Sequence, residues 1–386
     1  MKKVLLWLMV VTVVASMVAA FSLAGCKTAT TETAAAVTTA AAAETTAAAA
    51  GKMLTVAVCI RSTASEYHMQ YVAGAQLFVD TLPKGTAQVQ ILACEANDDK
   101  QINDVKALAA KSGKDTILYI DPNNAPNVTA IAQICEDNQI FWTDAWNSPE
   151  GIYPINKANG TPTYPHWALF ESCDGVKQGY DIAIEMFKSF KTPNQGTILA
   201  IDGMLANNAA VDRAAGLQQA LKENPGVKLL DEQPADWDTK KALALTETWL
   251  AKYPTVDGIW CACDDMAVGV VQALKAKGLN GKIKTTGVDG TSAGIAGVES
   301  GDIVCTIANN GWEQAGYGVA YAYAAYTGKI VPNDLPDGKR MFYTNGYLVT
   351  KDTLADYKAT FITSHPKYDF TNLDFPIARP MTVKTD

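Results

Sequence analysis

"LTVAVCI", residues 54–60, is the first of eight strand-like runs that recur along the chain. The others are VQILAC (89–94), TILYI (116–120), IFWTD (140–144), TILAID (197–202), GIWCAC (258–263), KTTGVD (284–289) and IVCTIA (303–308). Helical patterns lie between them, such as INDVKALAAKSG (102–113), AVDRAAGLQQALKENPG (210–226) and AVGVVQALKAKG (267–278). Buried strands that alternate with amphipathic helices form parallel sheets covered on both faces, so an α/β fold is predicted.

Polar and aromatic side chains gather where these runs end. They are Ser65, Glu66, Tyr67, His68, Asp144, Asp264, Asp265, Asp289 and Asn309. A single Asp at a strand end is usually a helix cap or a turn residue. Ligands of open parallel sheets, however, bind at the carboxyl ends of the strands. Several polar strand ends together therefore predict one shared cleft.

The N-terminal segment predicts export. In residues 1–25 two lysines precede a long apolar run that ends in small residues, which is typical of a signal peptide. The run is also nearly long enough for a membrane-spanning helix, but LAGC (23–26) resembles a bacterial lipobox, which implies a lipidated Cys26. Residues 26–51 are almost entirely Ala and Thr and have no apolar face, so they are expected to form a tether. The folded part is then expected outside the cell or in a periplasm, anchored by lipid at the outer face of the cytoplasmic membrane.

Composition limits the remaining possibilities. Residues 52–386 are too many for one core of ordinary size and suit two domains. The formal charge of −8 becomes −10 without Lys2 and Lys3, which argues against nucleic acid as a partner. The seven cysteines after Cys26 are scattered through apolar segments and favour core positions over a disulfide framework, although a Cys59–Cys94 pair is possible. Cys261 and Cys263 have no second pair at zinc-ligand spacing, and no metal or cofactor is expected.

Six segments together suggest a family. They are VAGAQ (72–76), DRAAGLQQAL (212–221), QPADWD (233–238), DDMAVG (264–269), TTGVDGT (285–291) and CTIAN (305–309). In this order and spacing they resemble the type I periplasmic sugar-binding proteins, particularly the ribose-binding group, over residues 54 to about 350. The resemblance implies two doubly wound parallel-sheet lobes, joined by three hinge crossings, that close over a ligand. It also implies a receptor that delivers the ligand to the permease and ATPase of an ABC importer.

The resemblance also places a site. Its residues are Ser65, Tyr67 and His68 in the first loop, Asp144 after the fourth strand, Trp237, Cys263, Asp289 and the hinge residue Asn309. Ala145 and Val211 stand where ribose binders of the family have arginine, and Cys263 replaces an amide. These departures argue against ribose itself but not against another sugar-like ligand. Arg213 is interpreted as structural.

These residue types suit a sugar. Aromatic rings stack on the apolar C–H faces of a pyranose, and carboxylates accept hydrogen bonds from its hydroxyl groups. We therefore expect Asp144 and Asp289 to accept hydroxyl hydrogens and Trp146 and Trp237 to form the walls. Trp146 is also compatible with a role in covering the hinge.

Some assignments leave two readings open. His68 is also compatible with an ordinary surface position, and Trp142 is expected to pack in the core. Asp264 and Asp265 begin a helix, and Asp265 is the better capping candidate, whereas Asp264 is expected nearer the cleft.

The expected lobes are residues 52–170 with 310–338 and residues 171–309 with 339–386, and the tail from Lys351 to Asp386 is expected to wrap the second lobe. A monomer is expected. The chain has no G-x-S-x-G elbow and only three histidines, so a binding protein is favoured over an enzyme. Two alternatives remain: a sensory receptor for a cyclitol, polyol or furanosyl signal molecule, and a glycosidase that uses Asp144 and Asp289 as a carboxylate pair.

Overall fold

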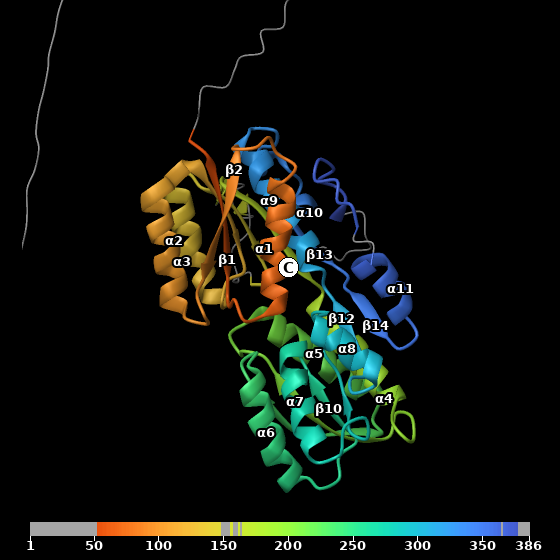
Figure 1. Ribbon diagram of the computed structural model, residues 1–386. Helices are drawn as coiled ribbons and strands as arrows, with labels where there is room; N and C mark the ends of the chain where they lie inside the picture. The colour runs from red at the N-terminus through yellow and green to blue at the C-terminus, as the bar shows by residue number, and fades with distance from the viewer. Residues whose placement is uncertain (1–51, 148–154, 157–160, 163, 364–365, 377–386) are drawn as a thin grey trace, which may run out of the picture. The chain divides into compact units, whose positions relative to one another are not determined.

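The computed structural model describes residues 52–147, 155–156, 161–162, 164–363 and 366–376 (Figure 1). The expected signal peptide, the lipidated Cys26 and the Ala/Thr-rich tether lie outside these residues. The described part contains two parallel sheets, each with its own helices. We call the part built on the six-stranded sheet the N-lobe and the part built on the four-stranded sheet the C-lobe.

The N-lobe sheet has six parallel strands in the order β13-β7-β4-β3-β1-β2. The strands are β1 (Leu54–Ile60), β2 (Ala87–Ala93), β3 (Thr116–Ile120), β4 (Phe141–Ala145), β7 (Trp167–Cys173) and β13 (Met341–Thr344). The helices are α1 (Glu66–Val79), α2 (Asp98–Ser112), α3 (Ala125–Asp137), α9 (Gly311–Tyr326) and α10 (Asp337–Arg340), with the short turns η1 (Gly113–Asp115) and η2 (Pro332–Asp334). Helices α1 and α9 pack together on one face of the sheet, and α2 and α3 pack together on the other (Figure 1). A two-stranded ribbon, β5 (Ile155–Asn156) with β6 (Thr161–Pro162), stands apart from the sheet.

The C-lobe sheet has four parallel strands in the order β11-β10-β8-β9. Its strands are β8 (Gly196–Asp202), β9 (Val227–Pro234), β10 (Gly258–Cys261) and β11 (Lys284–Thr285). An antiparallel pair, β12 (Cys305–Ala308) and β14 (Tyr347–Thr350), continues it through bridges from Thr286 to Cys305 and from Asp289 to Ala308. The helices are α4 (Gly175–Lys188), α5 (Asn208–Glu223), α6 (Thr239–Lys252), α7 (Asp264–Ala276), α8 (Ser292–Ser300), α11 (Leu354–Tyr357) and the one-turn η3 (Lys358–Thr363).

Local chemistry explains why these elements form. Every residue of β1 is buried, as expected for a strand covered by helices on both faces. Short polar side chains begin many of the helices. For example, Asn97 accepts the Lys100 amide at the start of α2, and Asp238 accepts the Lys241 amide at the start of α6. Such caps fix where each strand-to-helix loop ends, and these loops supply the site described below.

The chain passes between the lobes in three places, from β7 to α4, from β12 to α9 and from β13 to β14. The expected boundary at residue 170 falls inside β7, and the expected boundary at residue 338 falls before β13. Both strands pair in the N-lobe sheet, so the N-lobe extends further along the chain than expected at both places. The expectation that the whole tail wraps the C-lobe is wrong. Phe370 joins the aromatic cluster of Phe78 and Tyr317 in the N-lobe, because burying its ring there removes apolar surface from water.

Other expectations concern the interior. The seven cysteines of the described residues are all buried and unpaired, so Cys59 and Cys94 form no disulfide. Trp142 is buried in the N-lobe core, as expected. Among the residues that the structure describes, no helix has both the length and the apolar character needed to cross a membrane.

Candidate ligand-binding site

A cleft of about 500 Å³, including its open mouth, lies between the carboxyl ends of the two sheets. The N-lobe lines it with Arg61, Ser65, Tyr67, His68, Asp121, Pro122 and Trp146. The C-lobe lines it with Asn207, Ala209, Arg213, Trp237, Cys263, Asp265 and Asp289. Both lobes therefore contribute polar groups and aromatic rings to one space.

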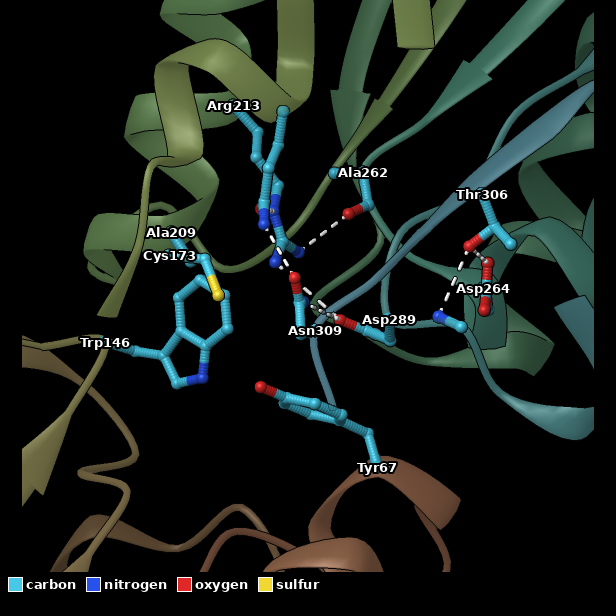
Figure 2. A network of polar contacts seen from close by, with 12 residues as sticks. Tyr67, Trp146, Cys173, Ala209, Arg213, Ala262, Asp264, Asp289, Thr306 and Asn309 are labelled. Atoms are coloured by element: carbon cyan, nitrogen blue, oxygen red, sulfur yellow. Dashed lines mark hydrogen bonds and ion pairs between the residues drawn. The ribbon is translucent and has the colours of Figure 1, made fainter. Parts of the chain in front are cut away.

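Arg213 organises the C-lobe wall of the cleft (Figure 2). Its side chain is only 3% exposed, and it donates from Nε to Gln178 Oε1 at 3.0 Å and from Nη1 to the Ala262 carbonyl at 2.8 Å. The remaining Nη2 lies 3.7 Å from Asp289 Oδ1. A buried cation needs such partners, because an unpaired buried charge is costly. Arg213 thereby acquires a fixed position at the edge of the cleft.

Asp289 closes a ring of polar contacts with this arginine. Gln178 Nε2 donates to Asn309 Oδ1 at 2.7 Å, and Asn309 Nδ2 donates to Asp289 Oδ1 at 3.3 Å (Figure 2). Burial raises the pKa of Asp289 well above its usual value, and the Arg213 guanidinium opposes this shift. Asn309 and Arg213 thus hold the Asp289 carboxyl group in place, and the residue also lines the cleft.

Two tryptophans flank Arg213. Its guanidinium carbon lies 4.9 Å from the Trp146 ring centre and 5.7 Å from the Trp237 ring centre, within cation–π range. Both tryptophans have a positive φ, 62° and 64°, which is uncommon for a bulky residue and is typical of functional loops. Trp146 Nε1 donates to the Tyr71 hydroxyl at 2.6 Å, and a Cβ on Gly203 would lie 2.0 Å from the Trp237 ring. Both indoles are therefore positioned by their surroundings and not by a ligand.

The N-lobe wall carries a second polar pair. His68 Nε2 lies 3.2 Å from Asp121 Oδ2, and both side chains are buried. His68 Nδ1 is buried without a hydrogen-bond partner among the described residues. Arg61 reaches across the cleft and donates to the Asp236 carbonyl at 2.8 Å. Burial raises the pKa of Asp265, and a hydrogen bond from Ser65 opposes that shift.

The structure places most of the expected residues in the cleft. Those that line it are Ser65, Tyr67, His68, Trp146, Trp237, Cys263 and Asp289. Asn309 lies one contact away, hydrogen-bonded to Asp289. Burial raises the pKa of the Cys263 thiol, so this residue presents a neutral S–H group.

The expectation that Asp144 faces the ligand is wrong. Asp144 is the fourth residue of β4, is 1% exposed and accepts a hydrogen bond from Trp167 Nε1 at 2.7 Å. The strand continues through Ala145, so Trp146 and not Asp144 is the first residue beyond it. Trp146 has a φ of 62°, so the chain leaves the strand conformation there and the indole lines the cleft, whereas the Asp144 side chain stays within the sheet. The carboxylate pair Asp144–Asp289 that a glycosidase would need is absent.

The expectation that Asp264 is the one nearer the cleft and Asp265 the cap is wrong: Asp265 lines the cleft, and the N-cap residue of α7 is Cys263. Asp264 accepts from the Thr291 amide and hydroxyl and from the Thr306 hydroxyl inside the C-lobe, and burial raises its pKa to about 7. Asp265 follows it on α7 and lines the cleft. Successive helical residues point about 100° apart, so only one of the two reaches the ligand space.

Sequence reasoning missed several lining residues. Arg61 and Asp121 directly follow β1 and β3, so the same rule of strand ends would have found them. Arg213 was interpreted as structural, because its position on α5 reveals neither its burial nor the two indoles beside it. Among the described residues no cluster of His, Cys, Asp or Glu could hold a metal ion.

Comparisons with known proteins agree with this geometry. The family described as periplasmic binding protein domain matches residues 56–330. The solved structure of a twin-arginine translocation pathway signal protein from Burkholderia phytofirmans is 32% identical, with a TM-score of 0.79 over 86% of this chain and 99% of that chain.

Two curated relatives add detail. A xylitol-binding protein from Mycolicibacterium smegmatis is 31% identical over 46% of this chain, and the match spans about half, 53%, of that relative's length. The ribose import binding protein RbsB from Haemophilus influenzae is 25% identical over 73% of this chain and 89% of its own length. The chain belongs to the periplasmic binding protein domain family.

Proposed function

We propose that this protein is an extracytoplasmic receptor that captures a small polyhydroxylated solute, a monosaccharide or a polyol, between its lobes. The observation that carries the proposal is the cleft itself, a space of about 500 Å³ bordered by the buried residues Arg213, Asp289 and Trp146 and by the half-buried Trp237. The protein acts as a binding protein and returns its ligand unchanged.

The chemistry of the walls favours a neutral ligand rich in hydroxyl groups. Asp121, Asp265 and Asp289 offer acceptors, and Arg61 and Arg213 offer donors. Each hydroxyl group can donate to a carboxylate and accept from a guanidinium, and such charge-assisted hydrogen bonds are stronger than neutral ones. The indoles supply apolar surface for C–H groups. Arg213 also supplies a cation that the sequence comparison with ribose binders had suggested was missing.

The relatives support this ligand class and the delivery route. Their names specify xylitol binding and ribose import, which are a polyol and a sugar function. We infer that the closed, loaded form delivers its solute to the permease and ATPase of an ABC importer. Ligand contacts from both lobes would favour this closed form.

We also infer a monomer held at the outer face of the cytoplasmic membrane by lipid on Cys26. The support is the sequence alone, namely the apolar leader, LAGC at 23–26 and the Ala/Thr-rich stretch that follows. A Cys26→Ala variant should shift the protein from the membrane fraction to the soluble fraction of the exporting cell. An unchanged membrane fraction would contradict the lipid anchor.

The ligand class is testable by a thermal-shift screen of the purified protein against pentoses, hexoses, pentitols and cyclitols. A ligand selective for the native state raises the melting temperature. Asp289→Asn and Trp237→Ala should each weaken the best ligand by roughly ten- to a hundredfold in calorimetric titration, because they remove a carboxyl acceptor and an apolar wall. Tyr326→Ala, which truncates an exposed ring far from the cleft residues in sequence, serves as the aromatic control. A screen that finds amino acids or nucleosides and no polyhydroxylated compound would overturn the proposed class.

A further inference from the structure

Glu66 of the N-lobe caps a helix of the C-lobe. The main-chain amide of Ser292 donates to Glu66 Oε1 at 3.0 Å and to Oε2 at 3.1 Å, and the Ser292 hydroxyl donates to Oε1 at 2.8 Å. Ser292 is the first residue of α8, and Thr291 before it is the residue that caps this helix within the C-lobe. Neither Glu66 nor Ser292 lines the cleft.

The Ser292 amide has no intrahelical acceptor, because the first amides of any helix lack one. A carboxylate at this end of a helix is also favoured by the helix dipole. When the lobes separate, the Glu66 carboxylate leaves α8 and both groups return to water. We expect these three hydrogen bonds to exist only when the lobes are closed.

A second helix of the C-lobe, α5, is also capped by a side chain of the N-lobe. The amide of Asn208, the first residue of α5, donates to Asn147 Oδ1 of the N-lobe at 2.9 Å, and Asn147 Nδ2 donates to the Pro122 carbonyl at 2.6 Å. Two helices of the C-lobe thus have their first amide satisfied by a side chain of the other lobe. Because Asn147 is buried beside the lining residue Trp146, the exposed Glu66–Ser292 pair is the better one to test.

We propose that Glu66 and Ser292 form a latch that stabilises the closed lobes and slows release of the ligand without touching it. The proposal rests on the proposed function only in that a solute is held between the lobes. A contact made only in the closed state increases the closed fraction, and the apparent affinity rises by the same factor. Ligand specificity belongs to the cleft, whereas the lifetime of the complex depends partly on this pair.

Two substitutions remove the latch from opposite sides. Glu66→Ala removes the acceptor. Ser292→Pro removes the amide hydrogen and the hydroxyl group, and it suits the backbone, because proline is favoured at the first helical position and Thr291 has the extended ψ of 160° that a residue before proline requires. Each should raise the ligand dissociation rate by about three- to tenfold and leave the association rate nearly unchanged, because the groups are exposed and gain only modest free energy from pairing.

The double variant and a matched control make the test specific. Glu66→Ala with Ser292→Pro should release ligand no faster than either single variant, since both remove the same contact. Glu185→Ala, which removes a partly exposed glutamate that pairs within α4 with Lys188, should release ligand at the wild-type rate. The melting temperature of the ligand-free open protein should be the same in all variants. Wild-type dissociation rates in both single variants, or additive effects in the double variant, would overturn the latch.

A ligand-independent readout separates this proposal from the proposed function. Fluorescent labels at Lys106→Cys in the N-lobe and Glu247→Cys in the C-lobe, both exposed positions, report the lobe separation in the ligand-free protein. The latch predicts that the closed fraction of the ligand-free protein is smaller in Glu66→Ala than in the wild type. If no polyhydroxylated solute binds, the proposed function fails, and this measurement alone decides the latch. An unchanged distribution of lobe separations would then refute it.

Discussion

Asp144 is a carboxyl group kept inside a sheet. Its Oδ1 accepts from Trp167 Nε1, and among the described residues its Oδ2 is buried without a partner. Burial raises the pKa of Asp144 well above its usual value, and hydrogen bonds from Trp167 and from the backbone amide of Asp144 itself oppose this. Burial therefore favours the neutral acid, and the side chain accepts an indole N–H in the core.

Asp144→Asn should keep this hydrogen bond and remove the acid. Because the folded-state pKa of Asp144 is raised, its contribution to stability is fully present below the unfolded pKa near 4 and is lost as the pH rises through the folded value. The variant should match the wild type near pH 4 and exceed its free energy of unfolding by roughly 1 to 3 kcal/mol at alkaline pH. Urea unfolding at several pH values measures this difference.

Ligand affinity provides the control for the same substitution. The affinity of Asp144→Asn should equal that of the wild type, because the side chain does not line the cleft. A large loss of affinity in this variant, comparable with that of Asp289→Asn, would show that Asp144 reaches the ligand after all.

At the scale of elements, helices α4 and α5 approach each other closely through glycine. A Cβ on Gly179 of α4 would lie 1.9 Å from the Arg213 carbonyl oxygen, and one on Gly216 of α5 would lie 2.0 Å from the Val176 carbonyl oxygen. No side chain fits in either place. The contact sets how deeply α5 sits, and thereby where Arg213 enters the cleft.

Gly179→Ala should therefore affect both stability and binding. Forcing the helices apart should cost roughly 1 to 3 kcal/mol of unfolding free energy, which exceeds the gain in helix propensity from alanine. The shift of α5 should weaken ligand binding several-fold, because Arg213 and its contacts to Gln178 and Asp289 move with the helix. Thermal unfolding and calorimetric titration check the two effects. Lys177→Ala, on the exposed face of α4, should change neither by much, and equal effects in both variants would contradict the argument.

The sequence was most informative where strands are buried on both faces. LTVAVCI and TILYI are strands with the predicted bounds, because uniformly apolar runs leave little choice of structure. β9 was missed because it is an edge strand with exposed polar positions, and β7 was missed because it buries Glu171 and Ser172. Only the first two residues of KTTGVD form a strand, and the rest makes single bridges.

The site was predictable only to within one or two residues. The rule of strand ends located the cleft, but the exact end of β4 decides between Asp144 and Trp146, and the phase of α7 decides between Asp264 and Asp265. Helix and strand ends are the positions that pattern alone defines least well. Arg213 reaches the cleft through the packing of α4 on α5, which no local pattern encodes.

At the scale of the whole described chain, the C-terminal segment ties back to the N-lobe. The chain forms β14, α11 and η3 in the C-lobe, and residues 366–376 then lie along α9. The Tyr317 hydroxyl donates to the Asp369 carbonyl at 3.2 Å, and the Tyr321 hydroxyl donates to the Leu373 carbonyl at 2.8 Å. Phe375 stacks on Tyr317 with ring centres 5.4 Å apart. Residues 366–376 are thus part of the N-lobe core.

Removal of this segment should destabilise the N-lobe. A chain that ends at Thr363 leaves Tyr317 and Phe78 without the Phe370 ring, which is 7% exposed. Phe370→Ala alone should lower the free energy of unfolding by roughly 2 to 4 kcal/mol, since it empties an aromatic site in a core. The truncation should cost at least as much, and its amide exchange should rise in α9 and α1 and stay unchanged in α6 and α7. A chain that ends at Pro376 retains all the contacts above and serves as the control for them. Faster exchange in the C-lobe helices, with α9 still protected, would instead show that the tail supports the second lobe.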